Sequence, residues 1–213
     1  NVGGFNSYGL KFLTSGTEKM RLDSSGNLGL GVTPSAWQST RRAFQIGPYS
    51  SMVAIGNNTF MGINYYSNSS GTPIYLSNGV ASLFSQESDG GSKWYTAPSG
   101  TAGNPVTFTQ AMTLDNSGNL GIGTTPSAWS GYKAIQVNGA SLAGSSNVMD
   151  LTSNTYFDGT NYKYITTDYA THYYQNTGRH VWLNAPSGTA GTNVAFTQAM
   201  TLDASGNLGL GVT

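Results

Sequence analysis

The chain contains no cysteine, which excludes disulfide bonds, thiolate nucleophiles and thiolate metal ligands. Charge is also scarce: Asp, Glu, Lys and Arg make up 8% of the 213 residues, and nine acids balance nine bases. A typical soluble domain carries about 25% charged residues. With no net charge and no run of Lys or Arg, the sequence lacks the electrostatic surface that binds nucleic acids.

Long apolar runs are missing as well. No segment approaches the roughly 18 consecutive apolar residues of a membrane-spanning helix, and the N-terminal stretch NVGGFNSYG lacks the features of a signal peptide. We therefore expect no membrane insertion. The chain does not begin with Met, and its last residues interrupt a recurring motif. We interpret it as part of a longer polypeptide.

One ten-residue motif occurs three times, at intervals of about 90 residues. It reads LDSSGNLGLG at 22–31, LDNSGNLGIG at 114–123 and LDASGNLGLG at 202–211. Such spacing predicts modules. We expect the end of a preceding module, a first module and a second module, each closing with a hairpin joint, over residues 1–33, 34–125 and 126–213.

The motif predicts a β-hairpin. Before the second copy, Val106, Phe108, Met112 and Leu114 lie at even spacing, which is typical of a strand with one apolar face. The sequence Asp115–Gly118 then suits a type I turn followed by a left-handed glycine.

The return strand leaves one face bare. Leu120 and Ile122 share one face, while Gly121 and Gly123 occupy the other. A bare glycine face suggests close approach of another backbone, and an isolated hairpin is marginal in water. We expect another chain or module to complete it, the alternative being a hairpin on the side of a self-contained domain.

The segments beside the hairpins are also repeated. Thr33–Trp37 and Thr125–Trp129 both contain Pro-Ser-Ala-Trp and predict a short helical turn whose Trp plugs the next module. The segments 56–93 and 152–180, in contrast, differ between modules. The pattern indicates structural joints between variable lobes.

Motifs for cofactor or metal chemistry are not found. Gly121-Ile-Gly123 lacks the third glycine and the following helix of a dinucleotide site, and there is no P-loop. Asp115, Ser117 and Asn119 alternate like calcium ligands but lack the closing Glu. We expect no cofactor, no metal and no catalytic residue.

Carboxylates leave an enzymatic alternative open, because a glycosidase needs only two of them. Glu87 with Asp89, and Asp158 with Asp168, lie in the variable segments, where they also suit solvated loops. The alternative function is a tailspike-like polysaccharide depolymerase that uses Asp158 and Asp168.

Aromatic residues offer better candidates for binding. Tyr and Trp present flat apolar faces with a polar edge, which suits sugars and protein surfaces. Strand alternation places part of the set inward, and we expect Trp94 and Trp182 in the core. The candidate receptor contacts are Tyr66, Tyr75, Tyr173 and Tyr174.

The repeated segments resemble a known family. MTLDNSGNLGIGTTPSAW (112–129), APSGTAGNPVTFTQAMTLD (97–115) and KAIQVNG (133–139) are similar to repeats of bacteriophage tail fibres and related phage appendage proteins. The resemblance implies an all-β, elongated repeat array of β-hairpin joints and small β lobes, wound as an intertwined parallel homotrimer. Such repeats often precede a self-cleaving chaperone domain.

The resemblance also implies a function. We expect a structural and adhesive component of the extracellular tail fibre of a virion, which positions or provides a host receptor-binding surface. Its partners would be its own copies, other tail or baseplate proteins, and a host cell-surface glycan or protein. A bacterial extracellular adhesin built from the same repeat is a further alternative. The joint residues would be Asp23, Gly26, Gly29, Gly31, Asp115, Gly118, Gly121, Gly123, Asp203, Gly206, Gly209 and Gly211.

Overall fold

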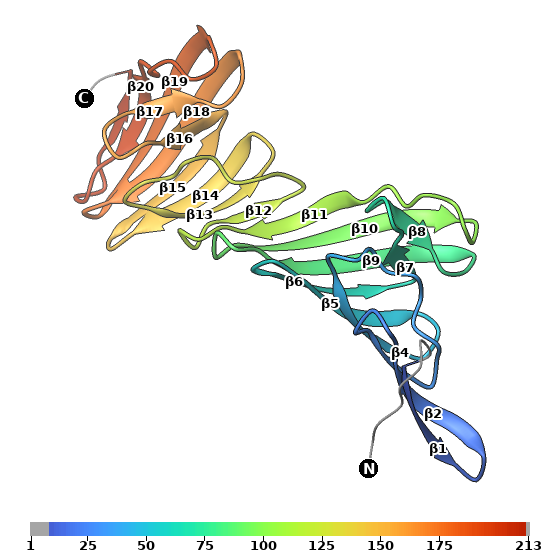
Figure 1. The fold of residues 1–213 in the computed structure, drawn as a ribbon. Helices are drawn as coiled ribbons and strands as arrows, with labels where there is room; N and C mark the ends of the chain where they lie inside the picture. Colours follow the sequence, from blue (N-terminus) through green and yellow to red (C-terminus); the bar gives the residue numbers. More distant parts are fainter. Residues whose placement is uncertain (1–8, 212–213) are drawn as a thin grey trace. The chain divides into compact units, whose positions relative to one another are not determined.

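The computed structural model describes residues 9–211. These residues form strands, turns and loops and contain no helix, as Figure 1 shows. The expected all-β class is therefore confirmed. The chain divides into two compact units, the first ending at Ala111 and the second beginning at Met112.

The first unit is a mixed sheet with a small hairpin beside it. Along the sheet the pairing runs β1-β2-β3-β4-β5-β6-β9-β10, antiparallel except for the parallel pair β3–β4. Strands β7 and β8 form the separate hairpin. The bounds are β1 Leu10–Thr14, β2 Thr17–Leu22, β3 Leu28–Leu30, β4 Arg42–Ile46, β5 Ser50–Ile55, β6 Asn58–Ile63, β7 Tyr65–Ser67, β8 Pro73–Tyr75, β9 Gly79–Gln86 and β10 Ser92–Gly100.

From β11, which begins in the last residues of the first unit and corresponds to β2, the second unit repeats this succession of pairings and adds β20 and β21 after β19. Its sheet runs β11-β12-β13-β14-β15-β18-β19-β20-β21, with β12–β13 parallel, and β16–β17 forms the separate hairpin. The bounds are β11 Thr109–Leu114, β12 Leu120–Ile122, β13 Lys133–Val137, β14 Ala140–Ser145, β15 Val148–Ser153, β16 Thr155–Phe157, β17 Tyr162–Tyr164, β18 Asp168–Asn176, β19 Arg179–Gly188, β20 Thr197–Leu202 and β21 Leu208–Leu210.

The motif forms a hairpin held by its aspartate. Strand β11 pairs with β12, with Leu114 opposite Leu120. In the turn, Asp115 Oδ1 accepts hydrogen bonds from the backbone N–H groups of Ser117 and Asn119, at 2.9 and 2.8 Å. Gly118 has φ 81°, the left-handed conformation that glycine adopts without strain. Asp23 and Asp203 accept the same bonds in their own turns.

The orientation of this hairpin differs from the sequence expectation. Thr113 is buried while Leu114 is 41% exposed, so the apolar face is the more exposed one and the glycine face is covered. A Cβ atom on Gly121 would lie 2.2 Å from Thr124 O and 2.9 Å from Pro126 Cδ. We expected another chain or module to cover this glycine face, and the backbone beside it belongs to the segment that follows the hairpin in the same chain.

The segment after the glycines contains no helical turn. Trp37 N–H donates to Ser35 O at 2.8 Å and Trp129 N–H to Ser127 O at 2.7 Å, which is the two-residue spacing of a γ-turn. Both tryptophans are buried, as a plug requires.

Each sheet has one covered face, which we call the inner face. In the first unit the β7–β8 hairpin covers it, because Tyr65 and Tyr75 pack with Val53 and Ala81 of the sheet. In the second unit Tyr164 of β17 packs with Ala170 in the same way. The opposite face of each sheet, which we call the outer face, carries the remaining side chains of the alternation.

Candidate functional site

The outer face of each sheet carries a continuous row of large apolar side chains. The strand registers align one such residue per strand, and we call these residues the outer apolar row. In the first unit the row is Leu28, Phe44, Met52, Met61, Phe84 and Trp94. In the second unit it is Leu120, Ile135, Leu142, Leu151, Tyr173, Trp182, Met200 and Leu210.

Much of the outer apolar row is exposed. Met52 is 48% and Met61 43% exposed in the first unit, and Leu142 is 45% and Leu151 54% exposed in the second. In the first unit the row lines a hollow of about 470 Å³. Contiguous apolar surface of this kind marks an interaction site.

The tryptophans expected in the core belong to this row. Trp94 packs against Phe84 with ring centroids 4.9 Å apart and the ring planes tilted by 43°, and Trp182 packs against Tyr173 at the same distance with a tilt of 38°. Both are half-buried, because they face outward from strands whose alternate residues form the core.

The four candidate receptor contacts do not form one surface. The expectation that Tyr75 faces outward is wrong, because it is 4% exposed and its hydroxyl donates to Pro98 O at 2.6 Å. Tyr66 is half-buried beside Trp37. Tyr173 and Tyr174 are neighbours on β18 and therefore project to opposite faces.

The acidic residues of the enzymatic alternative are engaged in local hydrogen bonds. Asp158 Oδ1 accepts from the backbone N–H groups of Thr160 and Asn161, both at 2.8 Å, and these bonds lower the pKa of Asp158. Asp168 Oδ1 accepts from Tyr169 N–H at 2.7 Å. Glu87 and Asp89 accept from Ser85 and Gly91.

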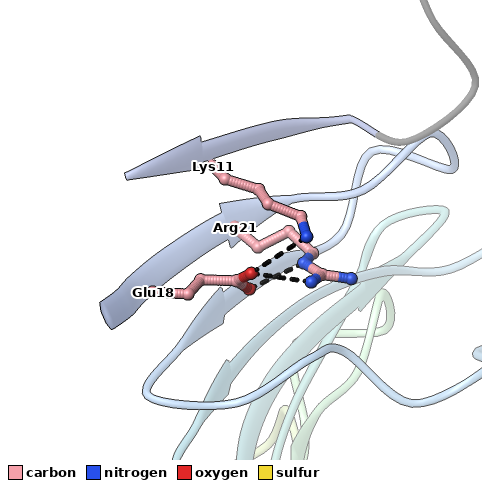
Figure 2. Close-up of polar contacts among 3 residues, drawn as sticks. All are labelled: Lys11, Glu18 and Arg21. Carbon is pink, nitrogen blue, oxygen red and sulfur yellow. Dashed lines mark hydrogen bonds and ion pairs between the residues drawn. The ribbon is translucent and has the colours of Figure 1, made fainter. Parts of the chain in front are cut away.

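A charged cluster links β1 and β2. In Figure 2, Arg21 donates two hydrogen bonds to the Glu18 carboxylate, both at 2.7 Å, and Lys11 Nζ lies 3.2 Å from Glu18 Oε2. The hydrogen bond from Arg21 is the main cause that lowers the pKa of Glu18 to about 2. These ionic contacts join the two strands of the β1–β2 hairpin at the surface.

A second polar cluster lies inside the second unit. Asp150 on β15 is 0% exposed and His172 on β18 is 4% exposed. His172 Nε2 lies 3.2 Å from Asp150 Oδ1, and the hydroxyl of Tyr162 donates to Asp150 Oδ2. Burial, and next the bond to Asp150, raise the pKa of Tyr162 far above its ordinary value.

This cluster lines a cavity of about 320 Å³, which we call the aromatic cavity. Four rings are in contact there: His172 lies 4.7 Å from Tyr162, 5.2 Å from Tyr174 and 5.4 Å from Phe196, measured between centroids. The lining residues are Tyr132, Val148, Asp150, Tyr162, His172, Tyr174, Asn176, Leu183 and Phe196.

Sequence reasoning missed the aromatic cavity and predicted only Tyr174 of its lining. The two histidines lie on opposite faces of the sheet: His172 faces Asp150 on the inner face, and His180 bonds to Tyr173 on the outer face. A usable signal was present: Asp150 interrupts a strand at a position where the first module has Phe60.

The described residues include no group of three His, Asp or Glu side chains placed to hold a metal ion. They also include no helix long and apolar enough to cross a membrane. Comparison with protein-family models gives no match, and comparison with curated protein sequences gives none either.

Proposed function

We propose that this chain is a structural and adhesive segment of a bacteriophage tail fibre that positions or provides a host receptor-binding surface. It assembles as a parallel homotrimer into an elongated array of hairpin joints and small β lobes. The resemblance of the joint sequences motivates the virion location and the threefold count. The outer apolar row is the structural observation that supports assembly.

The outer apolar row supports assembly because exposed apolar area lowers the free energy when it is removed from water. The inner face already has its cover within the chain, so the outer face is the one that gains from a partner. The row recurs in the same strand order in both units. A partner that repeats along its length in the same way fits it, and a second and third copy of this chain have that property.

A trimer also accounts for adhesion by weak contacts. Three identical chains present each surface three times, and linked copies raise the overall affinity by about 10² to 10⁴ without any new contact. The segments 56–93 and 152–180 differ in sequence between the modules. Such variation suits a surface that follows a changing receptor on the host cell.

The mass of the native particle tests the proposal. Light scattering on a size-exclusion column should give three times the 22.3 kDa of the chain. A stable monomer would contradict the proposal, because a monomer leaves the outer apolar row in water. A trimer whose gene lies among secretion and anchoring genes, rather than tail and baseplate genes, would favour the bacterial adhesin.

A further inference from the structure

A groove lies between two hairpin turns of the second unit, and we call it the turn groove. The turn between β14 and β15 provides Ser146 and Asn147, and the turn between β18 and β19 provides Thr177 and Gly178. Its volume is about 330 Å³, within the range of about 300 to 1,000 Å³ typical of ligand sites. The other lining residues are Val148, Met149, Gln175, Asn176, Arg179 and His180.

The turn groove carries a cation without a carboxylate partner. Its lining includes Arg179 and no Asp or Glu, and none of the ion pairs among residues 9–211 involves Arg179. Arg179 Nη2 donates to Asn176 Oδ1 at 3.1 Å. A guanidinium has several N–H donors, so most of them remain for a ligand. Arg179 is exposed, and a ligand in the turn groove can therefore reach it.

A chain of hydrogen bonds fixes a second donor. Gln175 Nε2 donates to the hydroxyl of Tyr173 at 2.6 Å, and that hydroxyl lies 2.6 Å from His180 Nδ1. Because the hydroxyl keeps its own hydrogen, it donates to Nδ1, and the neutral imidazole then carries its hydrogen on Nε2. His180 Nε2 has no partner among the described residues and is not buried. Its N–H is thus available to a ligand.

The first unit is built differently at the same place. Its β9–β10 turn carries two acids, Glu87 and Asp89, and Glu87 follows the glutamine of β9 as Asn176 follows that of β18. The backbone N–H of Ser88 donates to Asn58 Oδ1 at 2.7 Å, which ties the β9–β10 turn to the β5–β6 turn. The turns are therefore tied together and acidic in the first unit, while those of the second unit are separated by a groove with a free cation. The turn groove is a property of the second module's own sequence.

We propose that the turn groove binds an acidic pyranose of a glycan, such as a uronic acid, through its carboxylate. The planar guanidinium of Arg179 can donate two parallel hydrogen bonds to a carboxylate. His180 Nε2–H and the exposed amide of Asn147 add neutral donors, and Met149 offers apolar contact to the C–H face of the sugar. One guanidinium balances one carboxylate, whereas a phosphate group carries more negative charge than this site offsets.

The turn groove lies beside the surface that assembly would cover. Gln175 and His180 stand two residues beyond Tyr173 and Trp182 of the outer apolar row, which is about 7 Å along each strand. The site is therefore at the ends of the strands, past the row. The proposal deepens the proposed function and rests on it for its biological meaning, since the acidic sugar would belong to the host receptor.

The test uses the native protein and ligand-observed saturation-transfer NMR with matched pairs of methyl glycosides. The pairs are glucuronide with glucoside, galacturonide with galactoside, and mannuronide with mannoside, so that the members of a pair differ in the carboxylate. At least one acidic glycoside should bind about tenfold or more tightly than its neutral counterpart, because a hydrogen-bonded charge pair is lost in the neutral sugar. Added salt should weaken this binding.

Variants locate the site. Arg179→Gln should weaken binding of the responding acidic glycoside by about tenfold, with circular dichroism and native mass unchanged. Lys19→Gln is the matched control, because it removes the same charge from an exposed residue of the first unit, and it should bind normally. Tyr173→Phe removes the hydroxyl that orders the imidazole. It should weaken binding and shift the nitrogen resonances of His180 from the Nε2–H tautomer toward a mixture.

The outcomes are decisive and separable from those of the proposed function. Equal affinity for the two members of every pair, undiminished binding by Arg179→Gln, or no response from any acidic glycoside would overturn the proposal. A monomer that binds an acidic glycoside through Arg179 would support the sugar site and contradict the trimeric fibre. A trimer that adheres to bacteria and binds none of the acidic glycosides would contradict the sugar site alone.

Discussion

The carbonyl oxygen of Thr124 lies 2.2 Å from the point that a Cβ atom on Gly121 would occupy. Real Cβ atoms do not approach a backbone oxygen so closely, and Gly29 has the same relationship to Val32, at 2.1 Å. The glycine of the motif therefore allows the chain after the hairpin to fold back on it. The glycine therefore acts in the folding of the single chain, independently of any assembly.

Replacing Gly121 by Val should destabilise the chain itself. The added side chain must displace the backbone of Thr124 or the ring of Pro126, and such overpacking costs about 1–3 kcal/mol or more. Denaturant unfolding should show a lower midpoint. Gly139→Ala is the control, because a Cβ there meets no atom within 4 Å. Equal midpoints for the two variants would contradict this role of Gly121.

Asn154→Ala should destabilise the second unit by about 3 kcal/mol, because it leaves several backbone groups without their hydrogen-bond partner at once. The side-chain amide donates to Thr166 O and Tyr169 O, both at 3.0 Å, and accepts from Thr166 N–H at 2.7 Å. Its φ of 60° adds strain for alanine. Thermal unfolding measures the effect, with exposed Asn147→Ala as the neutral comparison.

The ion cluster on β1 and β2 predicts a pH dependence. The folded pKa of Glu18, about 2, lies below the ordinary value of 4.5. Its favourable interaction is therefore complete above the ordinary value and is lost as pH falls through about 2. NMR titration of the carboxyl should follow this course, and Arg21→Gln should raise the midpoint. An unchanged midpoint in that variant would show that Arg21 does not hold the carboxylate.

Leu142→Glu should prevent assembly without unfolding the chain. Leu142 is 45% exposed on the outer face, so the charge stays hydrated in the single chain and meets apolar surface only in the assembled particle. The native mass should fall to that of one chain, with circular dichroism unchanged. Asn57→Glu, in the exposed turn between β5 and β6, should assemble normally. Normal assembly of Leu142→Glu would remove the outer face from the interface.

The sequence predicted the hairpin of each motif correctly because its information is local. The register of β11 and β12 follows from alternating apolar residues and from the turn between them. In this turn Asp accepts backbone hydrogen bonds and Gly adopts the left-handed conformation. The same alternation could not show which face is inward. Thr113 and Gly121 face the covered side because the segment Thr124–Pro126, directly after the hairpin, folds back on it, and the alternation within the strands does not encode that return.

The aromatic cavity could not be predicted for a similar reason. Asp150 and His172 meet only because β15 pairs with β18 across the inserted β16–β17 hairpin. That hairpin also places Tyr162 next to Asp150 and His172, so that a third segment of the chain contributes to the cluster. Periodicity within one strand contains no information on such a pairing between distant segments, whereas comparison of the two modules reveals the unusual Asp.

The uncovered outer apolar row also affects how the protein comes to be made. A chain that folds alone presents this surface to every neighbour, and transiently exposed apolar surface promotes aggregation. Association of a chain with its own copies must then be faster than nonspecific aggregation. The yield of correctly assembled protein should be highest where chains meet their own copies early, as on a polysome that releases several identical chains side by side. In the proposed trimer, synthesis of the copies in one place would favour correct assembly.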